Sequence, residues 1–178
     1  MKKDKFELRM IGLVPYNIMP IQQGIQFGHS KDEMALKQIE RLLVGANIDA
    51  RFLDWLRNWK TYIILNGGTT NKRTSIDTGE PIGTLNQHLL TLGRHEIDFS
   101  TFYEEDLGDQ LTAITFIVDE RVWDTEKYPD FIDEYLADPS RQFTVDEFWS
   151  IRYKTWVDDI GGPKNAFLRE FLKPFKLA

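Results

Sequence analysis

Four short apolar runs along the chain have the spacing of β-strands. The run over 6–14 alternates at first and then becomes continuously apolar, which is typical of a strand with both faces buried at one end. The runs over 61–65 and 111–118 are rich in β-branched residues, and a shorter strand is predicted over 99–103. The sequence therefore predicts four strands.

The longest helical pattern follows the first strand. Apolar residues recur at helical spacing from position 21 to position 43, behind a proline at the helix start. Ser30 and Glu33 have the spacing of a capping box, which predicts a break near Gly28 and a second helix start there. Helical spacing also recurs in shorter stretches: about 49–58, 85–92 behind a Thr84 cap, 131–136, 145–157 and 165–171.

Strands separated by helices predict an α/β fold. We expect three layers, in which a mixed, mostly parallel four-stranded sheet has helices on both faces. The aromatic-rich helices at the end of the chain form a helical extension. The expected division is an α/β core over 1–122 and a helical appendage over 123–178, which covers the core or serves as a partner-binding arm.

Composition supports a folded chain. With 178 residues, 42% hydrophobic and 13% aromatic, the chain has enough apolar material for one core, which argues against disorder. There is no cysteine, so disulfides and thiolate metal sites are excluded. No apolar run reaches the roughly 18 residues of a membrane span, and the start lacks the apolar core of a signal peptide. The expectation is a cytoplasmic protein without membrane contact.

Charge lowers the expectation of nucleic-acid binding. The net charge is −6, and acidic side chains outnumber basic ones between positions 98 and 147. Proteins that neutralise phosphates usually carry a basic surface. The acidic stretch is interpreted as solvated surface, and the expected partner is an unidentified small ligand or protein. A homodimer is also compatible with the sequence.

The segment 21–30 carries a family resemblance. In archaeal/eukaryotic-type peptidyl-tRNA hydrolases the first strand leads into a helix that begins Gly-Lys-x-x-Ala-Gln-x-x-His-Ala. Gln26 and His29 have the spacing of the glutamine and histidine in that motif. Gln22 stands where the family has its catalytic lysine. The resemblance implies an α/β core and a site on the first helix.

Two further segments extend the resemblance over about 6–122. The tryptophan-containing stretch 55–65 is similar to a helix and strand of the family, and 105–114 is loosely similar to its Asp-Ala-Gly-x-Thr-Gln turn. Asp106 corresponds to the aspartate of that turn, although no threonine follows at the matching step. The stretches 20–29 and 111–123 also resemble uncharacterised proteins of tailed phages.

Gln22 in place of the lysine argues against the hydrolase activity that the resemblance implies, because an ammonium stabilises an oxyanion better than a neutral amide does. Two hypotheses follow. In the first, the chain lacks hydrolase activity and binds a small ligand, a protein or an RNA end through Gln22, Gln26 and His29, which share one helix face. In the second, it is an active acyl-ester or peptidyl-tRNA hydrolase with His29 or Asp106 as base and Gln22 as oxyanion donor.

Three more residues complete the candidate site. Asn66 precedes a Gly-Gly turn after a strand, where backbone amides approach ligands. Asp109 and Thr112 belong to the third similar segment. Four carboxylates crowd this turn, but their spacing is not that of a calcium loop, and a solvated acidic turn is the favoured interpretation. No metal and no cofactor is expected.

Overall fold

The computed structural model describes residues 6–70, 83–131 and 145–178. They form two compact units, which are described separately. The larger unit, called the body, comprises Glu7–Ile117 and Pro174–Ala178. The second, called the C-terminal helical unit, comprises Val118–Lys173 together with Phe6. The boundary between these units in the chain is at 117/118, and the last five residues group with the body. The expected division into a core over 1–122 and an appendage over 123–178 stays a prediction.

The body contains a four-stranded mixed sheet with the order β2-β1-β4-β3. Its strands are β1 (Leu8–Val14), β2 (Thr61–Asn66), β3 (Phe99–Glu104) and β4 (Gln110–Asp119), of which the last two residues belong to the other unit. β1 and β2 pair in parallel, whereas β3 and β4 are antiparallel. The predicted strands and the mixed sheet are confirmed, but a mostly parallel sheet is not.

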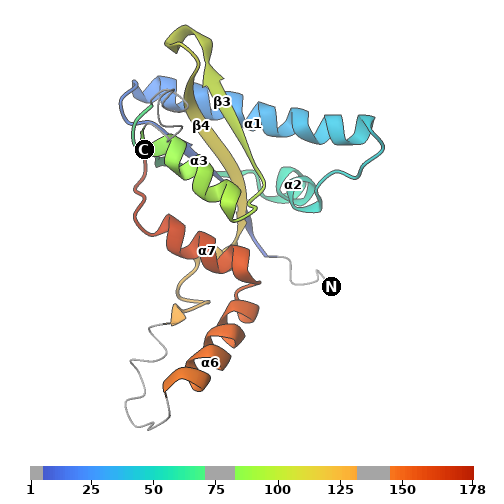
Figure 1. The fold of residues 1–178 in the computed structure, drawn as a ribbon. Coiled ribbons are helices and arrows are strands. Elements are labelled where there is room, and N and C mark those ends of the chain that lie inside the picture. The colour runs from blue at the N-terminus through green and yellow to red at the C-terminus, as the bar shows by residue number, and fades with distance from the viewer. Residues whose placement is uncertain (1–5, 71–82, 132–144) are drawn as a thin grey trace. The chain divides into compact units, whose positions relative to one another are not determined.

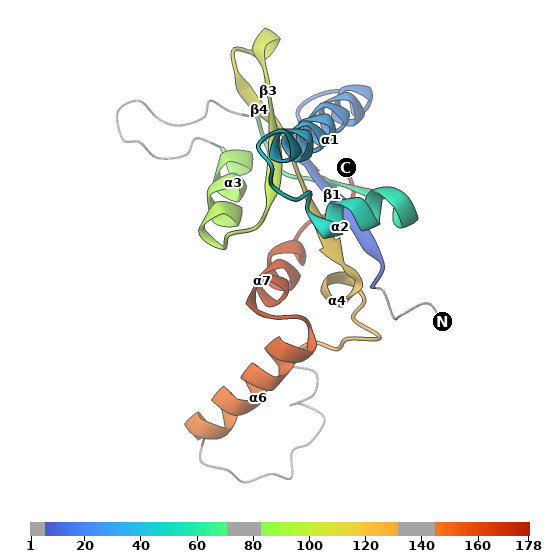
Figure 2. The same cartoon turned by 90° about the vertical axis from the view of Figure 1, so that its right-hand side faces the viewer.

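Helices cover both faces of this sheet. α1 (Pro20–Leu43) and α2 (Ala50–Asp54) lie on one face, and α3 (Thr84–Arg94) lies on the other (Figures 1 and 2). α2 continues into a π-helical turn, η1 (Trp55–Trp59). The arrangement gives three layers.

Alternation along β1 explains this layering. Met10 and Val14 are fully buried in the core that also contains Phe27 of α1 and Trp55 of η1. Successive side chains of a strand point to opposite faces, so Leu13 faces the layer of α3. β1 is thus buried on both faces, as its continuous apolar run predicts.

Gly12 lets α1 approach β1 closely. A Cβ atom on Gly12 would lie 2.2 Å from Cδ2 of Phe27. The Phe27 ring therefore occupies the space that any other side chain at position 12 would need. This close approach of helix and sheet depends on glycine.

α1 is one continuous helix of 24 residues, so the predicted break near Gly28 is wrong. Ser30 is buried in the middle of the helix and its hydroxyl makes tertiary contacts instead of capping a new start. The helix ends where Gly45 adopts a left-handed conformation, φ 76°, and the Ala46 amide donates to the Arg41 carbonyl over 2.8 Å.

The start of α3 also differs from the prediction. Gly83, with φ 89°, occupies the N-cap position, and it offers no side-chain cap. The Thr84 hydroxyl instead accepts a hydrogen bond from the Thr69 amide over 2.8 Å. Thr84 therefore ties the helix to the turn after β2 and is not the cap. The loop expected over 71–83 lies outside the described residues except at its last position.

The C-terminal helical unit contains α4 (Glu120–Trp123), α6 (Val145–Asp159) and α7 (Pro163–Leu172), which confirms the two last predicted helices. The buried Asp119 carboxylate accepts hydrogen bonds from the Asn165 amide and the Arg121 guanidinium. The helix expected over 131–136 lies outside the described residues except for Phe131. Among the helices that the structure describes, none is long and apolar enough to cross a membrane.

Candidate functional site

Gln26, the centre of the family-like motif, joins α1 to the β3–β4 hairpin. Its side chain is only 6% exposed. The amide nitrogen donates to Glu104 Oε2 over 2.6 Å, and the amide oxygen accepts from the Thr112 hydroxyl over 2.6 Å. Both ends of the amide are therefore occupied by neighbouring strands, in a buried chain of hydrogen bonds.

A β-bulge directs Thr112 at this amide. Phe102 pairs with Ala113 and Tyr103 pairs with Leu111, so Thr112 is the extra residue of β4. A bulge turns its unpaired residue away from the regular alternation. This allows Thr112, like Ala113 beside it, to face the layer of α1. The Thr112 hydroxyl donates to the Gln26 oxygen, and the expected ligand-binding role of Thr112 stays a prediction.

One turn further along α1, Ser30 makes the second part of the same seam. Its hydroxyl donates to the Ser100 carbonyl over 3.1 Å and lies 3.1 Å from the Thr115 hydroxyl. The Thr115 hydroxyl also reaches the Ser30 carbonyl. These contacts, together with those of Gln26, form a buried polar seam between α1 and the hairpin.

Gln22 and His29 lie outside this seam. Gln22 is exposed at the start of α1, where its side-chain oxygen accepts a hydrogen bond from the Met19 amide over 3.1 Å. This contact caps the helix. His29 is exposed, and its ring stacks on Phe102 with the centroids 4.5 Å apart. The three residues of the motif therefore have three different surroundings, although they belong to one helix.

The acidic hairpin tip is exposed. Asp106 lies in the short 3-10 turn Glu105–Leu107, and Asp109 has a left-handed backbone with φ 61° next to Gly108. No group of three potential metal ligands occurs among the residues that the structure describes. The interpretation of the hairpin tip as a solvated acidic turn stays a prediction.

Asn66 closes the turn after β2. Its side-chain oxygen accepts a hydrogen bond from the Gly68 amide over 2.9 Å. The same turn is bound to the segment after β1, because the Tyr16 amide donates to the Gly68 carbonyl and Asn17 exchanges two hydrogen bonds with Thr70. The Asn66 side chain therefore stabilises the turn conformation.

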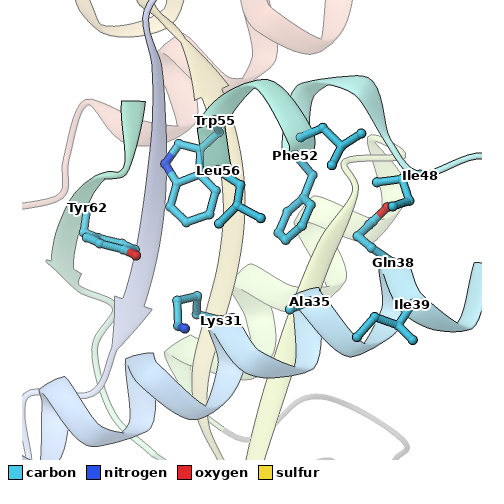
Figure 3. Close-up of a pocket in the computed structure, with 10 residues that line it drawn as sticks. Lys31, Ala35, Gln38, Ile39, Ile48, Phe52, Trp55, Leu56 and Tyr62 are labelled. Atoms are coloured by element: carbon cyan, nitrogen blue, oxygen red, sulfur yellow. The ribbon is translucent and has the colours of Figure 1, made fainter. Parts of the chain in front are cut away.

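A cavity of about 240 Å³ lies on the other side of the first helix. It is called the α1–α2 cavity here and is shown in Figure 3. Its lining residues come from α1, from the connection before α2, from α2 with η1, and from β2: Lys31, Ala35, Gln38, Ile39, Ile48, Phe52, Leu53, Trp55, Leu56 and Tyr62. Most of these side chains are apolar.

Polar groups stand at both ends of the α1–α2 cavity. Lys31 and Tyr62 lie at the end nearest Trp55, while Gln38 lies at the opposite end beside Ile48 (Figure 3). The Trp55 indole nitrogen donates to the Thr61 carbonyl over 3.1 Å, which fixes the ring as a wall. The cavity has an apolar middle with hydrogen-bonding groups at its ends.

The helical spacing over about 49–58 predicts the helix beside this cavity but not the cavity itself. A helical pattern shows which residues face the interior, and it does not show whether the facing elements fill the space between them. The one available signal is Ala35, a small residue between Lys31 and Gln38 on the same face of α1. Small residues leave room where larger side chains would pack.

The chain was compared with protein-family models, curated proteins and solved structures, and none of them matches it. The resemblance to peptidyl-tRNA hydrolases therefore rests on the residues quoted above alone.

Proposed function

We propose that the protein is a divergent peptidyl-tRNA-hydrolase-like binding protein without hydrolase activity, and that it holds a small, largely apolar molecule in the α1–α2 cavity. The observation that carries the proposal is the cavity itself. Apolar side chains that stay exposed around a recess are typical of a binding site, and Ile39, Leu56 and Tyr62, which line this one, are exposed. A space of about 240 Å³ beside Phe52 and Trp55 favours an occupant.

The size of the cavity supports a small ligand. An engineered apolar cavity of about 150 Å³ is large enough to bind benzene. By the same measure, the α1–α2 cavity accommodates about ten non-hydrogen atoms. Its apolar walls and few polar groups match the usual composition of small-molecule sites.

The surroundings of the motif residues support the absence of hydrolysis. A general base needs a free acceptor close to the reacting group, and an oxyanion donor needs a free N–H. The Gln26 side-chain nitrogen and oxygen are both occupied by hydrogen bonds, to Glu104 and Thr112 respectively. Gln22 offers an amide where the family has an ammonium, and His29 lies exposed against Phe102.

Hydrolysis is tested with acyl-tRNA and simple acyl esters, using wild type beside Gln22→Lys and His29→Ala. We expect no turnover by wild type. Turnover by wild type that disappears in His29→Ala would instead establish the active hydrolase with His29 as base. Activity that appears only in Gln22→Lys would support a lapsed relative of the family.

Binding is tested with the neutral probe 3-phenylpropanamide by saturation-transfer NMR. Ala35→Phe projects a ring into the cavity, and Ala50→Phe adds the same ring at an exposed position of α2 that does not line it. We expect binding by wild type and Ala50→Phe and its loss in Ala35→Phe, with circular dichroism showing that all three fold. Equal binding by both variants would refute the assignment of this cavity.

A further inference from the structure

We infer that the ligand of the α1–α2 cavity is a small aromatic or branched carboxylate, whose carboxylate pairs with Lys31 and whose far end offers a hydrogen-bond acceptor to Gln38. The inference rests on the proposed function and adds the chemical class of the ligand. Three observations carry it: a side-chain donor that opens onto the cavity, a cation with a weak partner, and the spacing between the two.

Gln38 supplies the unused donor. Its side chain is 2% exposed and lines the cavity. The side-chain oxygen accepts from the Asp49 amide over 2.9 Å, which fixes the orientation of the amide group. Among the described residues, no hydrogen bond is made by its side-chain nitrogen. The nitrogen opens onto the cavity, where a ligand acceptor can reach it.

Lys31 supplies the cation. Its ammonium lies 2.5 Å from the carboxylate of its neighbour Asp32, but that carboxylate is 70% exposed. An exposed ion pair between adjacent residues contributes little, because water and salt screen it. A ligand carboxylate on the cavity side can form an ion pair with the same Lys31 ammonium. Tyr62, whose hydroxyl faces the same end of the cavity, adds a neutral donor (Figure 3).

Helix geometry sets the separation of the two ends. Lys31, Ala35 and Gln38 stand at positions i, i+4 and i+7, so they share one face of α1. Seven residues of helix rise about 10 Å. A ligand that lies along this face, above Ala35, therefore carries its polar groups about 10 Å apart or slightly less. Leu56 and Phe52 lie across from Ala35 along its apolar middle (Figure 3).

Three probes of nearly equal size separate these contributions: 3-phenylpropanamide, 3-phenylpropionate and 3-(4-hydroxyphenyl)propionate. The first is neutral, the second adds the carboxylate, and the third adds an oxygen at the far end. By calorimetry we expect 3-phenylpropionate to bind about tenfold more tightly than the amide, as a charge-assisted hydrogen bond implies. The phenol oxygen strengthens binding again, and Gln38→Leu removes that second gain.

Variants of the cation test the pairing itself. Lys31→Met keeps the apolar stem and should bind acid and amide equally, whereas Lys31→Arg keeps the preference for the acid. Asp32→Asn frees the ammonium and should strengthen binding of the acid. If wild type binds the amide as tightly as the acid, or if Lys31→Met keeps the preference, the carboxylate assignment is wrong while the cavity remains a binding site. If no probe binds, the proposed function fails as well.

Discussion

Thr112 donates its hydroxyl hydrogen bond to the side-chain oxygen of Gln26 over 2.6 Å, and it is also the residue of β4 that the bulge leaves without a paired residue in β3. The β4 bulge at Thr112 and the buried Gln26 of α1 are therefore structurally linked. A regular strand would alternate Thr112 away from the layer of α1 and leave the buried amide oxygen without this donor.

Replacing Gln26 tests the importance of this feature. Gln26→Met keeps the length of the side chain but leaves the Thr112 hydroxyl and the Glu104 carboxylate without the amide. We expect the free energy of unfolding to fall by about 1–3 kcal/mol in urea denaturation. The control is Gln87→Met at an exposed position of α3, where a change within about 0.5 kcal/mol is expected. Equal effects at both positions would contradict a structural role of the seam.

Gly12→Ala should destabilise the body, because the new Cβ atom meets the Phe27 ring at 2.2 Å. We expect a loss of about 1–3 kcal/mol in chemical denaturation, which is typical of overpacking. Gly24→Ala in α1 is the matched control, since nothing lies within 4 Å of its added Cβ. That variant should gain up to about 1 kcal/mol from helix propensity. Recovery of Gly12→Ala by Phe27→Leu would identify the contact, and the absence of any recovery would speak against it.

The pKa of Asp130 should give the C-terminal helical unit a dependence on acid. Partial burial raises this pKa, but the hydrogen bonds and charges of Arg169 and Lys173 outweigh the burial and hold it below its ordinary value. A carboxyl with a lowered folded-state pKa stabilises the fold above its unfolded-state pKa, and the contribution disappears as the pH falls through the folded-state value. Wild type should therefore melt at a higher temperature than Asp130→Asn near neutral pH. The difference should shrink between about pH 5 and pH 2. A difference that does not change with pH would exclude the charge as its cause.

Arg169 and Lys173 contact the same carboxylate from different environments. The Arg169 side chain is buried and also donates to the Arg121 and Tyr128 carbonyls, whereas Lys173 is exposed. Arg169→Met leaves these acceptors unpaired and should cost about 3–5 kcal/mol. Lys173→Met should cost less than about 1 kcal/mol. Hydrogen exchange of the α7 amides measures both, and similar exchange in the two variants would refute the distinction.

Apolar periodicity was sufficient to predict the strands and most of the helices. β1 is an example, because its continuous apolar run requires burial on both faces, and Met10 and Leu13 are both fully buried. The same reasoning failed at Ser30, where a capping pattern suggested a helix start. The serine hydroxyl finds its partners on β3 and β4, residues far away in the sequence. Local patterns do not show such partners.

The candidate site was less predictable than the fold. Gln26 was selected because it matches the glutamine of the family motif and shares a helix face with Gln22 and His29. That pattern indicates a partner, but not whether the partner is a ligand or the protein itself. The bulge at Thr112 has no local signature in the sequence. The α1–α2 cavity depends on how far α2 stands from α1, and that distance follows from tertiary packing.

The polar seam also determines where α1 can rest along the hairpin. Contacts between apolar side chains alone would allow the helix to shift along the hairpin, because one apolar contact is similar in energy to the next. Gln26 and Ser30 are one helical turn apart, and each needs its own threonine. A shift of α1 by one turn, about 5.4 Å, would place Ser30 where Gln26 now lies. The Glu104 carboxylate would then lose its hydrogen bond from the Gln26 amide. The hydrogen bonds of the seam therefore fix the position of α1 along its own axis. This position keeps Lys31, Ala35 and Gln38 opposite Phe52 and Trp55.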